Sequence, residues 1–356
     1  MSDFLIYGIG GLLICFTIAT FLLDKIDAEL IPEDYEFQLD PFWYIISVML
    51  VGGVSAFIFF PTLQDTLYSY SLFDVIVPII LAAIIYISYL LGIGWLTNVL
   101  TLGAAAIMIS VLPSTFRLFP EQLELWQEKI AIILFLFTLS KGFGLLNGLG
   151  GIASMQFIAI MLAMVILVYF GALPQILGIL ALVYAGAMVA FAFFSFPPEK
   201  LIMNDGAFCS LGFIVGCLML FSAVEYAEVS LFIAASYLFT ETGLVLYRRY
   251  IEKIPCARGF MCTSYFLLSN DGEYEQGVIR GVFKILVIDL VFATIQIAAT
   301  ERLAFPVFTI ALNLWLLSIL SGDTKPEELL SISRWGKNAI KSALTKQKNN
   351  KKSRKK

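Results

Sequence analysis

Histidine is absent from this 356-residue chain, and acidic and basic side chains together make up only 14% of it. The missing histidine removes the commonest general base of enzymes and the commonest metal ligand. Cysteine offers no substitute, because the five cysteines form no C-x-x-C pair and the two in a polar loop, Cys256 and Cys262, have no histidine near them. A zinc site is therefore not expected.

Basic residues are also scarce in the body of the chain. Ten of the 23 lysines and arginines lie between Arg334 and Lys356, where there is no acid, which leaves 13 elsewhere against 27 acidic residues. No nucleic-acid partner is expected, because this positive charge lies on a terminal tail and not on a folded surface. Residues 323–356 are predicted to form a basic cytoplasmic tail that meets anionic lipid headgroups, or a solvated tail beyond Lys346.

What the chain has in excess is apolar sequence, with 60% hydrophobic residues and a mean hydropathy of +0.89. A transmembrane helix needs about 20 predominantly apolar residues. We therefore predict an all-α fold, a polytopic integral membrane helix bundle with about 11 transmembrane helices in one domain, 1–322. The predicted spans are Phe4 to Leu23, Pro41 to Phe60, Leu72 to Leu91, Trp95 to Leu112, Lys129 to Leu146, Met155 to Tyr169, Leu173 to Phe194, Ala207 to Ser222, Ala227 to Tyr247, Val282 to Ala299 and Ala304 to Leu320.

The same basic residues predict how the bundle is oriented. Fifteen of the 23 lie in the loop after Tyr247 and in the tail, and short loops rich in lysine and arginine stay in the cytoplasm. Eleven spans then place the N-terminus outside and the C-terminus inside, in a multi-pass protein of the inner (plasma) membrane. The polar turn from Pro197 to Gly206 falls on the cytoplasmic side.

That turn joins two apolar runs, and its charged side chains at a membrane edge are costly unless they have a role. The stretch FSFPPEKLIMNDGAFCSLGF, which begins at Phe194, resembles a signature of the polyprenyl-phosphate N-acetylhexosamine-1-phosphate transferases. These are glycosyltransferase family 4 type enzymes, the superfamily of undecaprenyl-phosphate GlcNAc-1-phosphate transferase and phospho-MurNAc-pentapeptide transferase. The positions that keep step are Gly186, Pro197, Pro198, Lys200, Met203, Asp205, Leu211, Gly212 and Phe213.

Two further stretches resemble the family in position. KGFGLLNGLGGI, Lys141 to Ile152, stands where the family has N-A-x-N-x-x-D-G-x-D-G-L. Downstream, Glu241 precedes the Arg248–Arg249 pair by seven residues, as an acid does in the family, and CARGFMCTS follows at the position of a histidine-rich loop. The resemblance is clearest over 141–299.

The resemblance implies an enzyme that transfers a HexNAc-1-phosphate from a UDP-sugar to undecaprenyl phosphate in cell-envelope glycan biosynthesis, with Mg²⁺ held by carboxylates. The sequence departs from the family pattern at the residues that would carry out this chemistry. Asn147 and Gly150 stand at the two acids of D-G-x-D-G, the histidines are gone, and no Asp or Glu occurs from Val75 to Pro120, where an Asp-Asp pair is expected. Asp205 is the matched acid that remains in the presumed core, and Glu241 keeps a charge at its own position.

Seven residues are therefore candidates for a site. Asp205 is the candidate catalytic and metal-binding residue, and Glu241 is a second metal ligand, for Mg²⁺ if the protein is active. The candidate phosphate-binding residues are Lys200, Asn204, Asn147, Arg248 and Arg249.

Most of these candidates have a structural alternative. With its partner acids missing, Asp205 is expected to cap the helix predicted from Ala207. Lys200 extends either to a phosphate or to lipid headgroups, Asn147 is expected to be a turn residue, and the arginine pair is expected to anchor its span on the cytoplasmic side.

The chain also has buried charges and a run of glycines. Lys141, Glu241 and Asp289 lie within predicted spans and are expected to face the bundle interior, where Lys141 pairs with one of the two acids. The glycines at 142, 144, 148, 150 and 151 are predicted to let helices approach closely.

Three functions are compatible with the sequence. The leading hypothesis is a catalytically degenerate transferase, a pseudoenzyme that keeps the scaffold and binds polyprenyl phosphate or a UDP-sugar, or pairs with an active transferase or a second copy of itself. The second is a divergent but active phosphotransferase whose metal is held by Asp205 and Glu241. The third is a transport or lipid-handling protein that uses the buried charges as a pathway. It would be expected to contain internal repeats or broken helices in matching halves, and the sequence shows no such symmetry.

Overall fold

The computed structural model describes residues 12–13, 16–18, 20–21, 46, 72–111, 117, 123–147, 151–196, 203–224, 228–251, 263–264, 275–296 and 304–320. Within these residues the regular structure is helical and there is no strand, in agreement with the predicted all-α fold. Most of the first two predicted spans, and all of the basic tail, lie outside the described residues.

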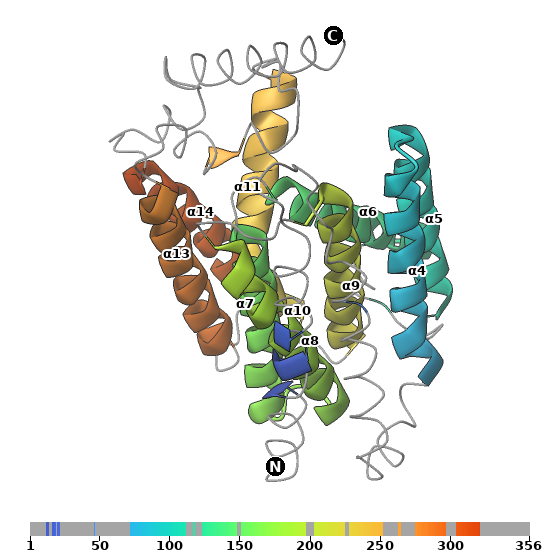
Figure 1. Ribbon diagram of the computed structural model, residues 1–356, viewed down its shortest axis with the longest axis horizontal. Helices are drawn as coiled ribbons and strands as arrows, with labels where there is room; N and C mark the ends of the chain where they lie inside the picture. Colours follow the sequence, from blue (N-terminus) through green and yellow to red (C-terminus); the bar gives the residue numbers. More distant parts are fainter. Residues whose placement is uncertain are drawn as a thin grey trace.

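The helices follow the order of the predicted spans from the third onward. They are α4 (Leu72–Leu90), α5 (Gly94–Val111), α6 (Leu125–Leu145), α7 (Ile152–Tyr169), α8 (Gln175–Ser195), α9 (Asp205–Val224), α10 (Glu228–Ala234), α11 (Ser236–Leu246), the π-helical turn η1 (Tyr247–Ile251), α13 (Glu275–Gln296) and α14 (Ala304–Leu320). Figure 1 shows α4 beside α5 at one side of the view and α13 beside α14 at the other.

Three of these helices are long and apolar enough to cross a membrane, namely α7, α8 and the part of α9 from Asp205 to Ala223. Shorter apolar helices cover Ile76–Leu90, Gly94–Ser110 and Pro306–Leu317. The architecture is that of a helical membrane protein. The number of eleven spans and the orientation stay predictions.

Two predicted spans differ from the structure. The ninth is broken at Ala235, whose φ of −94° and ψ of 4° lie outside the α-helical region and separate α10 from α11. The tenth begins seven residues early, at Glu275, and ends at Gln296. Apolar content placed its start at Val282, but polar residues with good helix propensity extend the helix beyond the apolar run.

Helix α9 is the centre of the bundle, and every side chain from Gly206 to Ala223 is buried. Its two central hydroxyls need no partner from another helix, because Ser210 donates to the Gly206 carbonyl at 2.8 Å and Ser222 to the Leu218 carbonyl at 2.9 Å. Such i−4 bonds satisfy hydroxyl groups where water is absent. The helix can therefore pack on all sides.

Glycines bring α6 and α9 close together, as predicted for the glycine-rich segment. A Cβ added to Gly144 would lie 2.5 Å from the Cys209 sulfur, and one added to Gly212 would lie 2.8 Å from the Leu139 carbonyl oxygen. Neither approach is possible for a larger residue without movement of a neighbour. The contact fixes the end of α6 against the start of α9.

A glycine in α8 allows the first predicted span to pack closely on that helix. A Cβ on Gly186 of α8 would lie 2.7 Å from the carbonyl oxygen of Leu12, and the Phe16 and Phe193 rings meet edge to face at 5.9 Å. The described part of the N-terminal segment therefore packs on α8.

Candidate functional site

The close contact of α6 with α9 brings two sequence-predicted site residues together. Asn147, just after α6, donates from Nδ2 to the Oδ1 atom of Asp205 at 3.0 Å, and also to the carbonyl oxygen of Met203 at 2.7 Å. Both acceptors belong to the chain that enters α9. Two segments that are 58 residues apart in sequence thus meet at one side-chain amide.

These two acceptors settle which end of the Asn147 amide faces Asp205. If the amide were reversed, its oxygen would point at a carbonyl oxygen and a carboxylate oxygen, and no hydrogen bond could form. The nitrogen is therefore the atom between them. An amide N–H cannot ligate a cation, so Asn147 meets Asp205 as a donor and not as a second ligand.

Asn204 is the residue that caps α9. Its side-chain Oδ1 accepts a hydrogen bond from the backbone N–H of Ala207 at 2.8 Å, the geometry of an N-cap. The prediction that Asp205 would be the cap is wrong, because the helix begins two residues earlier than expected and Asp205 is already in its first turn. An acid there is favourable next to the positive end of the helix dipole, and this leaves the Asp205 carboxylate to bond Asn147.

Lys141 does not pair with either acid that the sequence offered it. Its Nζ lies 5.7 Å from the centre of the Phe137 ring. The predicted pair with Glu241 or Asp289 is wrong, because those acids belong to other networks. Lys141 instead adds positive charge near the start of α9.

Glu241 belongs to a buried network after the broken span. Its Oε2 accepts from the Ser264 backbone N–H at 3.0 Å, its Oε1 lies 3.5 Å from the Tyr237 hydroxyl, and the Arg248 charge acts on it. Arg248 in turn donates from Nη2 to Ser264 Oγ at 3.2 Å. Glu241 and Arg248 are 1% and 2% exposed, whereas Arg249 is exposed. This network ties α11 and η1 to residues 263–264, and it engages Arg248, one of the two predicted phosphate-binding arginines.

The described residues offer one carboxylate to the Mg²⁺ ion that the resemblance implies, and not a cluster of acids. Asp205 and Glu241 share no hydrogen-bond partner among the described residues, and Asn147 offers Asp205 a donor. Across the described part of the chain, no three His, Cys, Asp or Glu side chains lie close enough to hold a metal ion. Mg²⁺ requires near-octahedral oxygen ligands with carboxylate charge, and this arrangement supplies one carboxylate.

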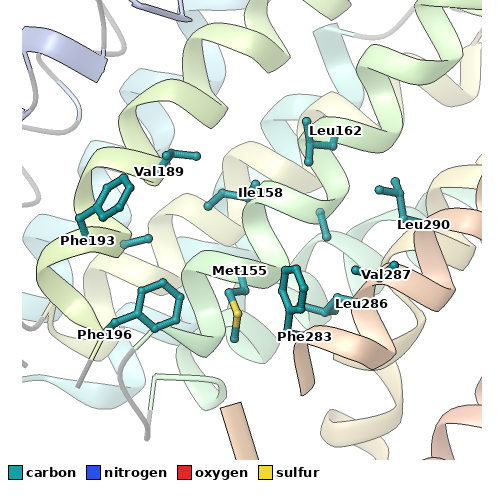
Figure 2. A pocket seen from close by; sticks show the side chains of 12 residues that line it. Met155, Ile158, Leu162, Val189, Phe193, Phe196, Phe283, Leu286, Val287 and Leu290 are labelled. Atoms are coloured by element: carbon teal, nitrogen blue, oxygen red, sulfur yellow. The ribbon is translucent and has the colours of Figure 1, made fainter. Parts of the chain in front are cut away.

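A separate apolar groove lies between α7, α8 and α13. Its volume is about 250 Å³, and it is lined by Met155, Ile158, Ala159, Leu162, Val189, Ala192, Phe193, Phe196, Phe283, Leu286, Val287 and Leu290. Figure 2 shows Phe196 and Met155 at one end of the groove and Leu162 and Leu290 toward the other. Phe196 is the last described residue before the polar turn. Lys200, the remaining predicted phosphate-binding residue, lies outside the described residues.

Comparison with protein-family models and with curated proteins finds no match for this chain. The likeness to the transferases therefore rests on the residues quoted above.

Sequence reasoning missed two features of the described residues. The groove is lined by residues of three helices. In a wholly apolar stretch, the sequence has no periodicity that would indicate which helix face lines a groove. A buried polar cluster of Ser236, Asp289 and Asn313 was also missed, although an Asn inside the apolar run of α14 is a signal of a polar contact between helices.

Proposed function

We propose that this protein is a catalytically degenerate relative of the sugar-1-phosphate transferases, a membrane protein that binds a polyprenyl phosphate without transferring a sugar phosphate to it. One observation carries the proposal. Where the family has a second acid near the acid of α9, Asn147 holds Asp205 by an amide N–H at 3.0 Å. A pair of ligands for a metal is thereby replaced by a donor and its acceptor.

A basic side chain near this end of α9 supports anion binding. Lys141 lies near the end of α6, the helix that packs closely on α9. Basic side chains recognise phosphate oxygens, whereas both amide hydrogens of Asn147 are already donated to Asp205 and Met203. Lys200 of the polar turn would add a further ammonium group.

The apolar groove supports a lipid ligand. It offers a lining of aliphatic and aromatic side chains along α7, α8 and α13, and Phe196, at one end of it, directly precedes the polar turn in the sequence. A polyprenyl phosphate has the same division into a long apolar chain and a small anionic head. The chain would lie in the groove and the phosphate would lie at the turn.

The proposal is tested by lipid binding with the purified protein in nanodiscs. Native mass spectrometry with undecaprenyl phosphate is expected to detect a bound lipid in the wild type, and Ala192→Trp, which fills the groove, is expected to reduce the bound fraction several-fold. Ile84→Trp is the matched control, because Ile84 is exposed on α4 and does not line the groove. Equal binding by both variants would show that the groove does not hold the lipid. No binding by the wild type would refute the proposal.

The transport hypothesis expects broken helices in matching halves of the chain. The interruption at Ala235 is a single residue, and backbone hydrogen bonds of the i−4 type are kept on both sides of it.

A further inference from the structure

Asp289 is a carboxylate in the interior of α13 with no exposed surface. Its Oδ2 accepts from Asn313 Nδ2 at 3.1 Å, and the Ser236 side chain and the Tyr237 backbone N–H lie near the carboxylate. All of these neighbours are neutral. Its other oxygen, Oδ1, is buried and has no hydrogen-bond partner among the described residues.

The break between α10 and α11 lies beside this carboxylate. Ser236 is the first residue of α11, and its Oγ accepts from the same Asn313 Nδ2 at 2.9 Å. From α7, Gln156 donates through Nε2 to the carbonyl oxygen of Ala234, the last residue of α10, at 3.0 Å. Side chains from three other helices, α7, α13 and α14, thus converge on one interrupted helix.

Asp289 has no basic partner on its own helix. Arg280 and Lys284 of α13 are exposed, and they precede Asp289 by nine and five residues, so they lie about 180° and 140° around the helix from it. Glu275 lies at the start of α13 and adds negative charge only. The carboxylate therefore faces away from the basic residues of α13.

The four helices packed against α13 supply no cation either. Helices α7 and α14 contain no charged residue, and α10 contains only Glu228, at its first position. In α11 the only charged residue is Glu241, which belongs to the Arg248–Ser264 network. The other titratable groups are the Tyr237 hydroxyl, directed at Glu241, and the exposed Tyr169 at the end of α7.

The unpartnered atoms of the cluster are all acceptors. Asn313 uses its amide nitrogen for Ser236 and Asp289, so its Oδ1 is left buried without a partner, as are Asp289 Oδ1 and Gln156 Oε1. A buried carboxylate without a positive partner is strongly disfavoured, and each unpaired acceptor adds to the cost. A small positive charge bound by these oxygens would remove both penalties.

We propose that Asp289, Asn313 and Ser236 form an intramembrane site for a monovalent cation, either a proton or Na⁺, at the helix break. One carboxylate with neutral oxygens matches a single positive charge, whereas Ca²⁺ and Mg²⁺ sites use several charged or strongly held oxygen ligands. Carboxylate and carbonyl oxygens also suit hard cations better than soft ones. The site is independent of the proposed lipid binding, because it shares no residue with the groove or with the Asn147–Asp205 contact.

Thermal unfolding of the full chain in nanodiscs tests the site. At fixed ionic strength and pH, replacing choline by Na⁺ is expected to raise the Tm of the wild type by about 2 °C per tenfold increase above the dissociation constant, and to leave Asp289→Asn unchanged. If the cation is a proton, the Tm is independent of Na⁺ and falls as pH rises, because loss of the proton leaves a bare buried carboxylate, and the Asn variant lacks that fall. Glu241→Gln, at another buried acid, is the control and keeps either response.

A second measurement keeps the test decisive if Asp289→Asn does not fold. A hydrophobic carbodiimide reacts with protonated carboxyl groups in apolar surroundings, and peptide mass spectrometry of the wild type then locates the adduct. Labelling of Asp289 that Na⁺ prevents identifies a Na⁺ site, and labelling that only high pH prevents identifies a proton site. A wild-type Tm that responds to neither Na⁺ nor pH, or a Na⁺ response that persists in Asp289→Asn, overturns the proposal.

Discussion

The side-chain nitrogen of Asn147 lies 3.0 Å from the Asp205 carboxylate and 2.7 Å from the Met203 carbonyl oxygen. Asn147 stands at the position of an acid in the transferases that the sequence resembles, and here it is a donor that holds the entry to α9 in place. The contact connects α6 to α9 at the point where the sequence most resembles the transferases. Several consequences of this contact and of its surroundings are measurable.

Replacing Asn147 by Asp is expected to restore a metal-binding pair. Two carboxylates would then face each other and a carbonyl oxygen, so the variant should lose about 1–3 kcal/mol of stability and regain it when Mg²⁺ is added. Thermal unfolding with and without Mg²⁺ measures both effects. Asn147→Ala is the control, since it loses the hydrogen bonds without gaining a ligand. A Mg²⁺ response in the wild type equal to that of the Asp variant would contradict this account of the site.

The cap of α9 belongs to Asn204 and not to Asp205. Asn204→Ala is expected to cost about 0.5–2 kcal/mol, because the Ala207 N–H loses its acceptor, while Asn204→Asp keeps an acceptor and most of the stability. The measurement is the Tm of the two variants in the same nanodiscs. Equal losses in both would mean that the side chain acts in some way other than as a cap.

Close packing of α6 on α9 predicts a large effect of a single methyl group. Gly212→Ala would place a Cβ 2.8 Å from the Leu139 carbonyl oxygen, and overpacking of this kind costs about 1–3 kcal/mol. Gly103→Ala in α5 is the matched control, because no atom lies within 4 Å of its added Cβ and Ala favours a helix over Gly. The prediction fails if Gly212→Ala unfolds no earlier than Gly103→Ala.

The two arginines after α11 are expected to behave differently. Arg248→Ala removes the donor to Ser264 from a buried network and should cost about 1–3 kcal/mol. Arg249→Ala, at an exposed position, should stay within about 0.5 kcal/mol of the wild type. In the double variant Arg248→Met with Glu241→Gln, part of the loss should be recovered. If Arg248 binds phosphate instead, the single variant would fold normally and lose only its ligand.

The sequence predicted much of the helix order, because long apolar runs separated by glycine, proline and charge are unambiguous in a membrane protein. The spans that became α4, α5 and α14 begin and end within one residue of their predicted limits. The break at Ala235 was missed because the residues on both sides of it are apolar and helix-compatible. Its visible cause lies in a distant segment, the Gln156 side chain that bonds the Ala234 carbonyl.

The residues of the candidate site could be predicted from the sequence, but their contacts could not. The resemblance placed Asn147 near Asp205, and the structure joins them directly. The roles of the side chains depended on which atoms face each other across helices, and composition does not contain that information. For this reason we predicted the cap at Asp205 and an acidic partner for Lys141, and the structure shows neither.

We propose that this protein does not transfer a sugar phosphate to its lipid. The most direct measurement is the transfer of GlcNAc-1-phosphate from UDP-GlcNAc to undecaprenyl phosphate by the purified protein with Mg²⁺, followed as labelled lipid product. We expect the wild type to form product only at the background level, and Asp205→Asn to give the same level. Product above background in the wild type that is abolished in Asp205→Asn would contradict it.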